Sequence, residues 1–176
     1  MRITGYLSML FLFIAITGCN GQTGKNSGGN KSVSPVSQVN AGNDGLPRQL
    51  TKQDFLKMVM NYEKNTEVWV YEGNKPCLVD FYADWCGPCK LTSPILEELS
   101  KQYGDRINFY KVDIDEEQEL AAIFGIQSIP TFLFCPMDGQ PTMSSGIARS
   151  KEETKQMFIK QIEELLLKKD NSSTTI

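Results

Sequence analysis

The feature that most constrains the fold is an apolar run that leads into a pair of closely spaced cysteines. Residues 76–82 are nearly all apolar, as expected of a strand that is buried on both faces. The motif Trp85-Cys86-Gly87-Pro88-Cys89 follows, and a helical pattern begins directly after it. Because a buried strand that feeds a helix is the repeating unit of an α/β sheet, we expect the two thiols at a strand-to-helix junction.

Helices are predicted at four places where apolar residues recur at helical spacing. The helix after Cys86 should bend at Pro94 and end at Gly104. Caps at Thr51, Asp115 and Ser150 should begin the other three. The expected apolar positions are Phe55, Val59 and Tyr62 in the first helix, Leu91, Ile95 and Leu99 in the second, and Phe158, Ile162, Leu165 and Leu166 in the last.

Strands are predicted where β-branched and aromatic residues cluster between turn signals. A short strand that ends near Gly146 should form a hairpin with the strand before it. Strands that alternate with helices predict an α/β fold with a mixed central sheet and helices on both faces. The expected strands before that hairpin turn cover residues 68–71, 76–82, 107–112 and 131–135.

The composition excludes several classes of function. None of the 176 residues is histidine, so Ser-His-Asp catalysis, histidine-bearing zinc sites and haem attachment are impossible. A net charge of −3 gives no basic surface for nucleic acid. Catalysis must therefore use cysteine, carboxylates, lysine or backbone groups.

The first residues have the pattern of an export signal. Arg2 precedes an apolar run over 7–16 that is too short to cross a bilayer. Because Ile16-Thr17-Gly18-Cys19 resembles the bacterial lipobox, we expect residues 1–18 to be a lipoprotein-type signal peptide, cleaved before a lipidated Cys19. The alternative is an ordinary cleaved signal in which Cys19 is incidental.

Composition also divides the rest of the chain. Residues 19–46 are rich in Gly, Ser and Asn, which predicts a flexible linker after the lipidated cysteine. Residues 170–176 are polar and predict a disordered tail. The periodic pattern lies between them, so a single folded domain is expected over 47–169.

The spacing of Cys86 and Cys89 is typical of a redox-active pair. The unpaired N–H groups at a helix start favour a thiolate at Cys86, which makes it the expected nucleophile. Cys89 lies one turn inside the helix and should resolve the mixed disulfide. Gly87 would let a partner backbone approach closely, and Pro88 needs no N–H partner at a helix start.

The stretch from Asp80 to Lys90 resembles the active-site stretch of the thioredoxin family. The resemblance runs from about residue 47 to 168 and implies a thioredoxin fold, with a mixed sheet of four to five strands flanked by helices on both faces. The other matching positions, in order, are Pro94, Lys111, Asp113, Ile129-Pro130-Thr131, Gly139 and Gly146.

The resemblance also implies roles for particular residues. Asp80 would be a buried carboxylate beneath the disulfide that accepts a proton from Cys89, and Lys111 would be its charge partner. The Ile129–Pro130 bond would be cis and would present its backbone to an extended substrate segment. The implied substrate-binding residues are Trp85, Gly87, Pro88, Ile129, Pro130 and Gly146. The redox-active disulfide would serve in place of a cofactor, and no metal site is expected.

Two features depart from the family pattern. The segment between Phe55 and Asp80 is longer than usual, and its residues 67–73 are expected to add an edge strand or a hairpin arm. Cys77 and Cys135 are extra cysteines, and the family sheet would place them opposite each other on adjacent antiparallel strands. They would be either two buried free thiols or a second disulfide.

The resulting hypothesis is a protein-disulfide reductase that is lipid-anchored in the periplasm of a Gram-negative bacterium. It would act as a monomer on disulfide-bearing exported proteins and take electrons from a membrane thiol donor. The same site used as an oxidase or isomerase is an alternative. A four-thiolate metal module and a binding module that uses Trp69 and Tyr71 are further alternatives.

Overall fold

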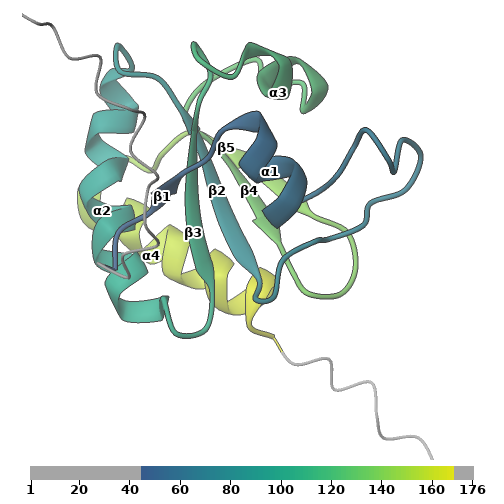
Figure 1. Cartoon of the computed structure of the whole chain (residues 1–176). Helices are drawn as coiled ribbons and strands as arrows, with labels where there is room; N and C mark the ends of the chain where they lie inside the picture. Colours follow the sequence, from purple (N-terminus) through teal and green to yellow (C-terminus); the bar gives the residue numbers. More distant parts are fainter. Residues whose placement is uncertain (1–44, 169–176) are drawn as a thin grey trace, which may run out of the picture. The chain divides into compact units, whose positions relative to one another are not determined.

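The computed structural model describes residues 45–168 (Figure 1). The predicted signal peptide, Cys19, most of the predicted linker and the predicted tail lie outside these residues. None of the helices within 45–168 has the length and apolarity needed to cross a membrane. The elements in order are β1 (Arg48–Gln49), α1 (Lys52–Met58), β2 (Cys77–Tyr82), α2 (Gly87–Tyr103), β3 (Asn108–Asp113), α3 (Gln118–Ile123), β4 (Thr131–Cys135), β5 (Thr142–Ser145), α4 (Lys151–Gln161) and a π-helical turn over Ile162–Leu166.

The strands form one mixed sheet in the order β1-β3-β2-β4-β5. β2 lies at its centre, parallel to β3 and antiparallel to β4, and β1 and β5 are the edges. Helices α2 and α4 cover one face, and α1 and α3 cover the other (Figure 1). The predicted fold, a mixed sheet with helices on both faces, is confirmed.

Alternation along the central strands builds a core on each side of the sheet. Leu78 on β2 and Phe109 on β3 face α2 and α4, whereas Val79 and Tyr110, one residue further on, face α1 and α3. Because both faces are covered, β2 is buried over nearly its whole length. The strand that leads to the cysteines is therefore fixed from both sides.

The predicted helix starts at Thr51 and Ser150 are confirmed. Each hydroxyl accepts a hydrogen bond from the backbone N–H three residues later, and at Thr51 the Asp54 side chain completes the capping box. Gly104 follows the last residue of α2, as predicted, but its φ is −59° and not left-handed. A Cβ at Gly104 would lie 2.6 Å from the Ser100 carbonyl oxygen, so close approach is what requires glycine there.

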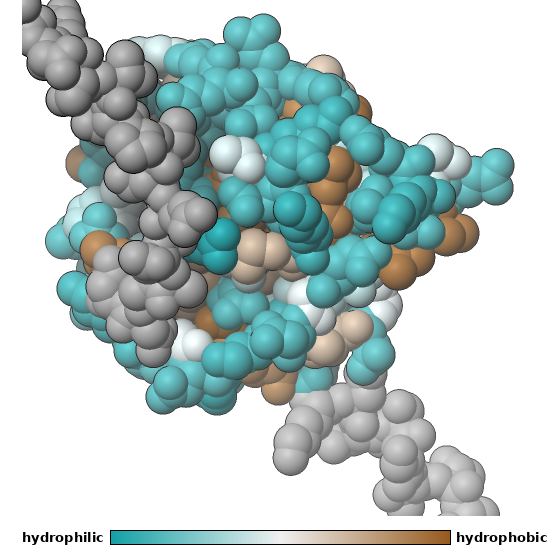
Figure 2. All heavy atoms as spheres, viewed as in Figure 1, coloured by the Kyte–Doolittle hydropathy of each residue, from teal (hydrophilic) through white to brown (hydrophobic). Residues whose placement is uncertain are grey.

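The predicted strand over 68–71 is wrong. Segment 59–75 contains no strand, and its only pairing is an isolated bridge between Met60 and Tyr71. Val68 and Val70 are exposed, by 63% and 39%. Residues with high β propensity form a strand only where a neighbouring strand can pair with them. The edge of the sheet next to β3 is already occupied by β1, so this segment has no partner strand. Figure 2 shows apolar surface among polar residues on the side of the molecule where this segment lies.

Three smaller predictions about helices are also wrong. Helix α1 ends at Met58, so Tyr62 lies outside it. Leu91 is 61% exposed, although Ile95 and Leu99 are buried as expected. Positions four apart drift by about 40° around a helix, so Leu91 falls at the margin of the buried face of α2. Asp115 does not cap α3, because Glu117 precedes its first residue and makes no side-chain cap.

Candidate active site

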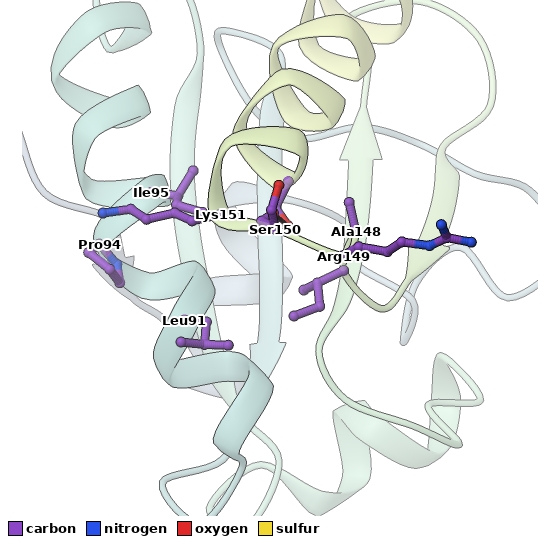
Figure 3. A pocket seen from close by; sticks show the side chains of 9 residues that line it. Leu91, Pro94, Ile95, Ala148, Arg149, Ser150 and Lys151 are labelled. Atoms are coloured by element: carbon purple, nitrogen blue, oxygen red, sulfur yellow. Dashed lines mark hydrogen bonds between the residues drawn. The ribbon is translucent and has the colours of Figure 1, made fainter.

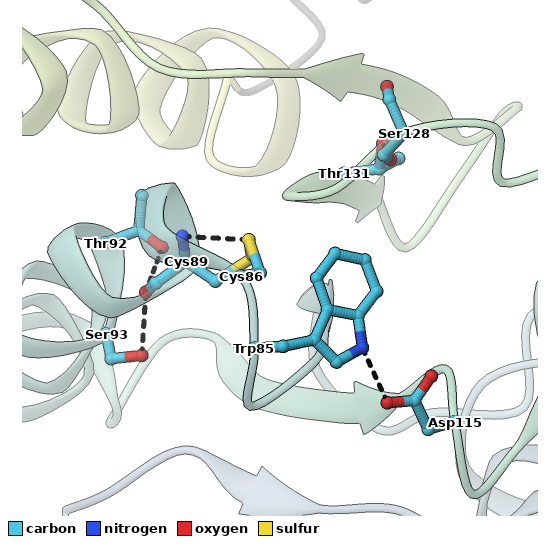
Figure 4. The surroundings of a disulfide bond; sticks show 8 residues. All are labelled: Trp85, Cys86, Cys89, Thr92, Ser93, Asp115, Ser128 and Thr131. Atoms are coloured by element: carbon cyan, nitrogen blue, oxygen red, sulfur yellow. Dashed lines mark hydrogen bonds between the residues drawn. A yellow bond between two sulfur atoms is a disulfide. The ribbon is translucent and has the colours of Figure 1, made fainter.

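The two cysteines of the motif lie where β2 passes into α2, and they form a disulfide (Figure 4). Cys86 is the N-cap of α2, in extended conformation, and its backbone N–H donates to the Ala83 carbonyl at 3.1 Å. Gly87 and Pro88 form the start of the helix and are exposed. Cys86 and Cys89 are only 3% and 1% exposed, so a partner must approach the sulfur atoms closely.

The Cys86 sulfur takes the place that a capping oxygen holds in other helices. Its Sγ atom accepts a hydrogen bond from the Cys89 backbone N–H at 3.1 Å (Figure 4). The N–H groups of a first helical turn have no partners within the helix, and the aligned peptide dipoles add positive potential there. Both effects favour negative charge on Cys86, which is the condition for a nucleophilic thiol.

Hydroxyl groups fix the next turn of α2. The Thr92 and Ser93 side chains both donate to the Cys89 carbonyl at 3.0 Å (Figure 4). Pro94 follows and lacks an N–H, so the helix is short of one backbone donor at this point. The two hydroxyls hold the Cys89 backbone in place beside that gap.

The loop before β4 is tied to the end of β5. The Ile129–Pro130 peptide bond is cis, as expected, and Pro130 is buried. The Gly146 N–H donates to the Pro130 carbonyl at 2.9 Å, and Gly146 has a φ of 83°, which favours glycine. Thr131, which also lies in the surroundings of the disulfide, holds the same loop by donating to the Ser128 carbonyl at 2.7 Å (Figure 4).

Trp85 is a surface residue and not part of the core. Its side chain is 67% exposed, and its indole N–H donates to an Asp115 carboxylate oxygen at 2.8 Å (Figure 4). Asp115 is held in turn because its N–H donates to the Asp113 carboxylate at 2.9 Å. Sequence reasoning assigned Asp115 to a helix cap and missed this contact. The position of Asp115 just after β3 could have predicted the contact. Trp85 follows β2, which is parallel to β3, and the carboxyl ends of parallel strands lie at the same edge of a sheet.

Asp80 lies on β2 and is 4% exposed. Its Oδ1 atom has no hydrogen-bond partner. Burial raises the pKa of Asp80 to about 7, and the positive charge of Lys111 only partly opposes this rise. An unpaired buried carboxyl with a pKa near neutrality can take up and return a proton.

Lys111 lies beside Asp80 but does not form an ion pair with it. The two residues are in register on β3 and β2, and the Lys111 ammonium group lies 5.0 Å from the centre of the Tyr82 ring. No Lys111–Asp80 contact is among the ion pairs of residues 45–168. Lys111, the expected charge partner, therefore affects the Asp80 carboxyl by its electrostatic field and not by direct contact. Its ammonium group is held by the cation–π contact with Tyr82.

A small cavity connects Asp80 with the surface. It has a volume of about 110 Å³ and offers polar groups to water. Ser93, whose hydroxyl donates to the Cys89 carbonyl, lines the cavity and so connects it with the backbone of Cys89. The lining residues are Leu46, Pro47, Asp80, Ser93, Leu96, Glu97 and Lys111.

An apolar groove of about 250 Å³ lies between α2 and the start of α4 (Figure 3). Leu91 and Pro94 form its α2 side, and Ile147, which follows Gly146, forms part of the other side. Arg149 and Lys151 line it and are exposed. The groove is therefore continuous with the loop that Gly146 ties to Pro130.

The remaining two cysteines do not belong to this site. Cys77 and Cys135 are free, buried and paired in register at the end of β2 that is remote from Cys86. The length of β2, six residues at about 3.4 Å each, separates the two pairs of sulfur atoms. Four thiolates therefore do not converge, and the residues 45–168 contain no cluster of three or more potential metal ligands.

A disulfide at a helix start, a cis-proline loop and a buried carboxyl together define a thiol–disulfide exchange site. The thioredoxin family model matches residues 50–162. A thioredoxin of Borreliella burgdorferi is 53% identical over 97 residues, which are 55% of this chain and 82% of that protein. A thioredoxin of Bacillus subtilis is 42% identical over 85 residues, 48% of this chain and 81% of that protein.

The similarity extends to solved structures. One chain, from work on the thiol resolving mechanism in yeast mitochondrial 1-Cys peroxiredoxin via glutathione/thioredoxin systems, has a TM-score of 0.50 and 28% identity, over 68% of this chain and 95% of that one. The family model covers more than half of the sequence, so the chain belongs to the thioredoxin family. It is a disulfide oxidoreductase, like its thioredoxin relatives.

Replacing Asp80 by Asn should stabilise the protein in a pH-dependent way. The native pKa of about 7 lies above the ordinary 3.8, so between these values the native state binds a proton that the unfolded state has lost. Wild-type stability should therefore fall as pH rises from about 4 to about 7. The advantage of Asp80→Asn should grow over this range to a few kcal/mol, at most about 4.

Urea unfolding of both proteins between pH 3 and pH 8 measures this difference. Leu91→Asn, an exposed substitution on α2, is the control and should show no such trend. A stability difference between Asp80→Asn and wild type that stays constant with pH would mean that Asp80 is not a buried, titrating acid.

Proposed function

We propose that the protein is a reductase of protein disulfides, with Cys86 as nucleophile and Cys89 as resolving thiol. The observation that carries this proposal is the Cys86 Sγ atom at the N-cap of α2, where it accepts the Cys89 N–H. The family membership supplies the class of reaction. The placement of the sulfur supports the proposed order of the two thiols.

The reaction transfers two electrons from the dithiol to a substrate disulfide. The Cys86 thiolate attacks one substrate sulfur, a mixed disulfide forms, and the other substrate sulfur leaves and takes up a proton. Cys89 then loses its proton, attacks Cys86 and releases the second substrate thiol. Asp80 is the proposed acceptor of the Cys89 proton, since its pKa of about 7 leaves a large ionised fraction at neutral pH.

The direction toward reduction is supported by the groups around the disulfide. Cations beside Cys86 would stabilise the thiolate and make the disulfide more oxidising. The motif instead has Gly87 and Pro88 between its cysteines, and the chain has no histidine. An ionised Asp80 near the first turn of α2 opposes thiolate formation and so favours the disulfide product.

The redox potential of the Cys86–Cys89 pair tests this direction. The full chain is equilibrated in glutathione buffers of graded ratio, and the free thiols are alkylated at each point and mapped. We expect a potential below that of the glutathione pool, together with reduction of insulin disulfides. A potential above the pool would favour the oxidase or isomerase alternative, and the absence of any reversible couple would overturn the enzymatic proposal.

The substrate would lie over the exposed groups around the disulfide as an extended segment. Trp85 provides an apolar ring. Apart from its chain neighbours and the backbone of its own helix, nothing lies within 4 Å of the position of a Cβ on Gly87, so a substrate backbone can approach there. The Pro130 loop lies nearby and is fixed by Gly146. Part of the same segment would occupy the groove beside Leu91, which continues from Gly146 through Ile147.

Leu91→Glu should slow the reduction of protein disulfides selectively. Partial burial of one leucine against a substrate is worth about 1 kcal/mol, so kcat/KM on insulin should fall by about five- to tenfold. Reduction of oxidised glutathione, which is too small to fill the groove, should be unchanged. Val68→Glu is the matched control, since Val68 is 63% exposed and Leu91 61%. Equal activity of both variants on insulin would exclude the groove from substrate binding.

The protein would act at a bacterial membrane facing the periplasm. The support is sequence alone: the apolar run over 7–16, the lipobox-like Ile16-Thr17-Gly18-Cys19 and the Gly/Ser-rich residues that follow. Its substrates would be exported proteins with disulfides, and a membrane thiol donor would reduce it again. Labelled fatty acid should be incorporated into the wild-type chain and not into Cys19→Ser. Equal labelling of both would exclude lipidation at Cys19.

A further inference from the structure

Cys77 and Cys135 form a close pair of thiols that the catalytic reaction does not use. They are directly opposite each other in the antiparallel register of β2 and β4. Both are free, and both are 0% exposed. Directly opposed residues on antiparallel strands have Cα atoms about 4.5 to 5.5 Å apart, within the range of about 4.4 to 6.8 Å that a disulfide needs. The separation of the two strands is therefore within the range that a disulfide between them requires.

The pair occupies the last rung of the ladder between β2 and β4. Pro76 precedes Cys77, and Pro136 follows Cys135. Neither proline has an N–H group, so the ladder between the two strands ends here. The end of a strand pair opens at a lower free-energy cost than its middle. Local opening at this rung would therefore expose the pair to an oxidant without unfolding of the whole domain.

Tyr71 from segment 59–75 is partly buried and packs against the core cluster that contains Cys77 and Cys135. Burial, and then the adjacent Cys77, raise the pKa of Tyr71 well above its ordinary value. Its hydroxyl donates to the Lys75 carbonyl. A Cβ on Gly73 would collide with the Tyr71 ring, so the segment passes closely over it. The two features that depart from the family pattern, the longer segment and the extra cysteines, therefore contact each other.

We propose that Cys77 and Cys135 are a second redox couple, which forms a cross-strand disulfide under oxidising conditions and is shielded by Tyr71. In the reaction, the two thiols give two electrons and two protons to a disulfide oxidant such as oxidised glutathione. One S–S bond forms between β2 and β4, and the oxidant's S–S bond breaks to give two thiols. The new bond would join the strand that leads to Cys86 with the strand that follows Pro130.

The first experiment removes the catalytic couple and counts the remaining thiols. The full chain carrying Cys86→Ser and Cys89→Ser is unfolded, refolded in glutathione buffers of graded ratio, denatured with an alkylating reagent and digested. We expect Cys77 and Cys135 to lose alkylation together and to be recovered as one cross-linked peptide. Because the catalytic cysteines are absent, the result does not depend on the proposed reductase function.

The same protein provides a stability readout. Its urea midpoint should be higher after oxidation than after reduction, and Cys77→Ala in the same background should abolish the difference. Full alkylation of both cysteines in the most oxidising buffer would overturn the proposal. Recovery of Cys77 or Cys135 joined to glutathione or to Cys19, and not to each other, would overturn it as well.

The second experiment tests the shielding by Tyr71. In the folded chain, Tyr71→Ala should speed oxidation of the Cys77–Cys135 pair by about tenfold or more, because a large, partly buried ring packed against the rung is lost. Tyr71→Phe keeps the ring and should stay near the wild-type rate. Val68→Ala, in the same segment but exposed, controls for general loosening. An unchanged rate in Tyr71→Ala, or an equal increase in Val68→Ala, would overturn the role of Tyr71.

Discussion

The hydrogen bond from the Cys89 N–H to the Cys86 sulfur is the interaction on which the site depends. It exists because β2 is buried on both faces and delivers the chain to the start of α2 at a fixed position. The sulfur then takes the position of a capping oxygen. It lies at the N-terminus of α2, where the helix dipole gives a positive potential. The surrounding groups, from Trp85 to the Pro130 loop, are arranged around this one atom.

Asp80 is the opposing electrostatic element. Its carboxyl is buried and unpaired, and burial raises its pKa to about 7. The helix start favours negative charge on Cys86, whereas an ionised Asp80 disfavours additional negative charge in the same region. In the proposed reaction, the balance of the two would allow a reactive thiolate without a strongly oxidising disulfide, and Asp80 would take up the Cys89 proton.

Much of the fold could be predicted from sequence because its main signals are local. The apolar run of β2, the cysteine spacing, the caps at Thr51 and Ser150 and the cis bond before Pro130 each depend on neighbouring residues. The opposed positions of Cys77 and Cys135 followed from the family sheet, and the register agrees. The placement of two thiols opposite each other on adjacent strands could therefore be predicted from the sequence, whereas the choice between free thiols and a disulfide could not.

The failures come from contacts between distant parts of the chain. β1 has two residues, too few for any periodicity, and exists through its pairing with β3. The residues 68–71 have β propensity but no partner strand. Asp115 follows a strand and suggested a cap, whereas its carboxylate binds the Trp85 indole across the site. The cavity at Asp80 requires Leu46 and Pro47, which no local pattern connects with β2.

The pKa of the Cys86 thiol, measured on the reduced protein from the ultraviolet absorbance of its thiolate, tests the central claim most directly. The Cys89→Ser variant leaves Cys86 as the only thiol of the motif, and the double variant Cys86→Ser/Cys89→Ser provides the background of the other cysteines. We predict a pKa for Cys86 clearly below the ordinary value of about 8.5, because the helix start stabilises the thiolate. A Cys86 pKa at or above that value would contradict the role assigned to the N-cap sulfur.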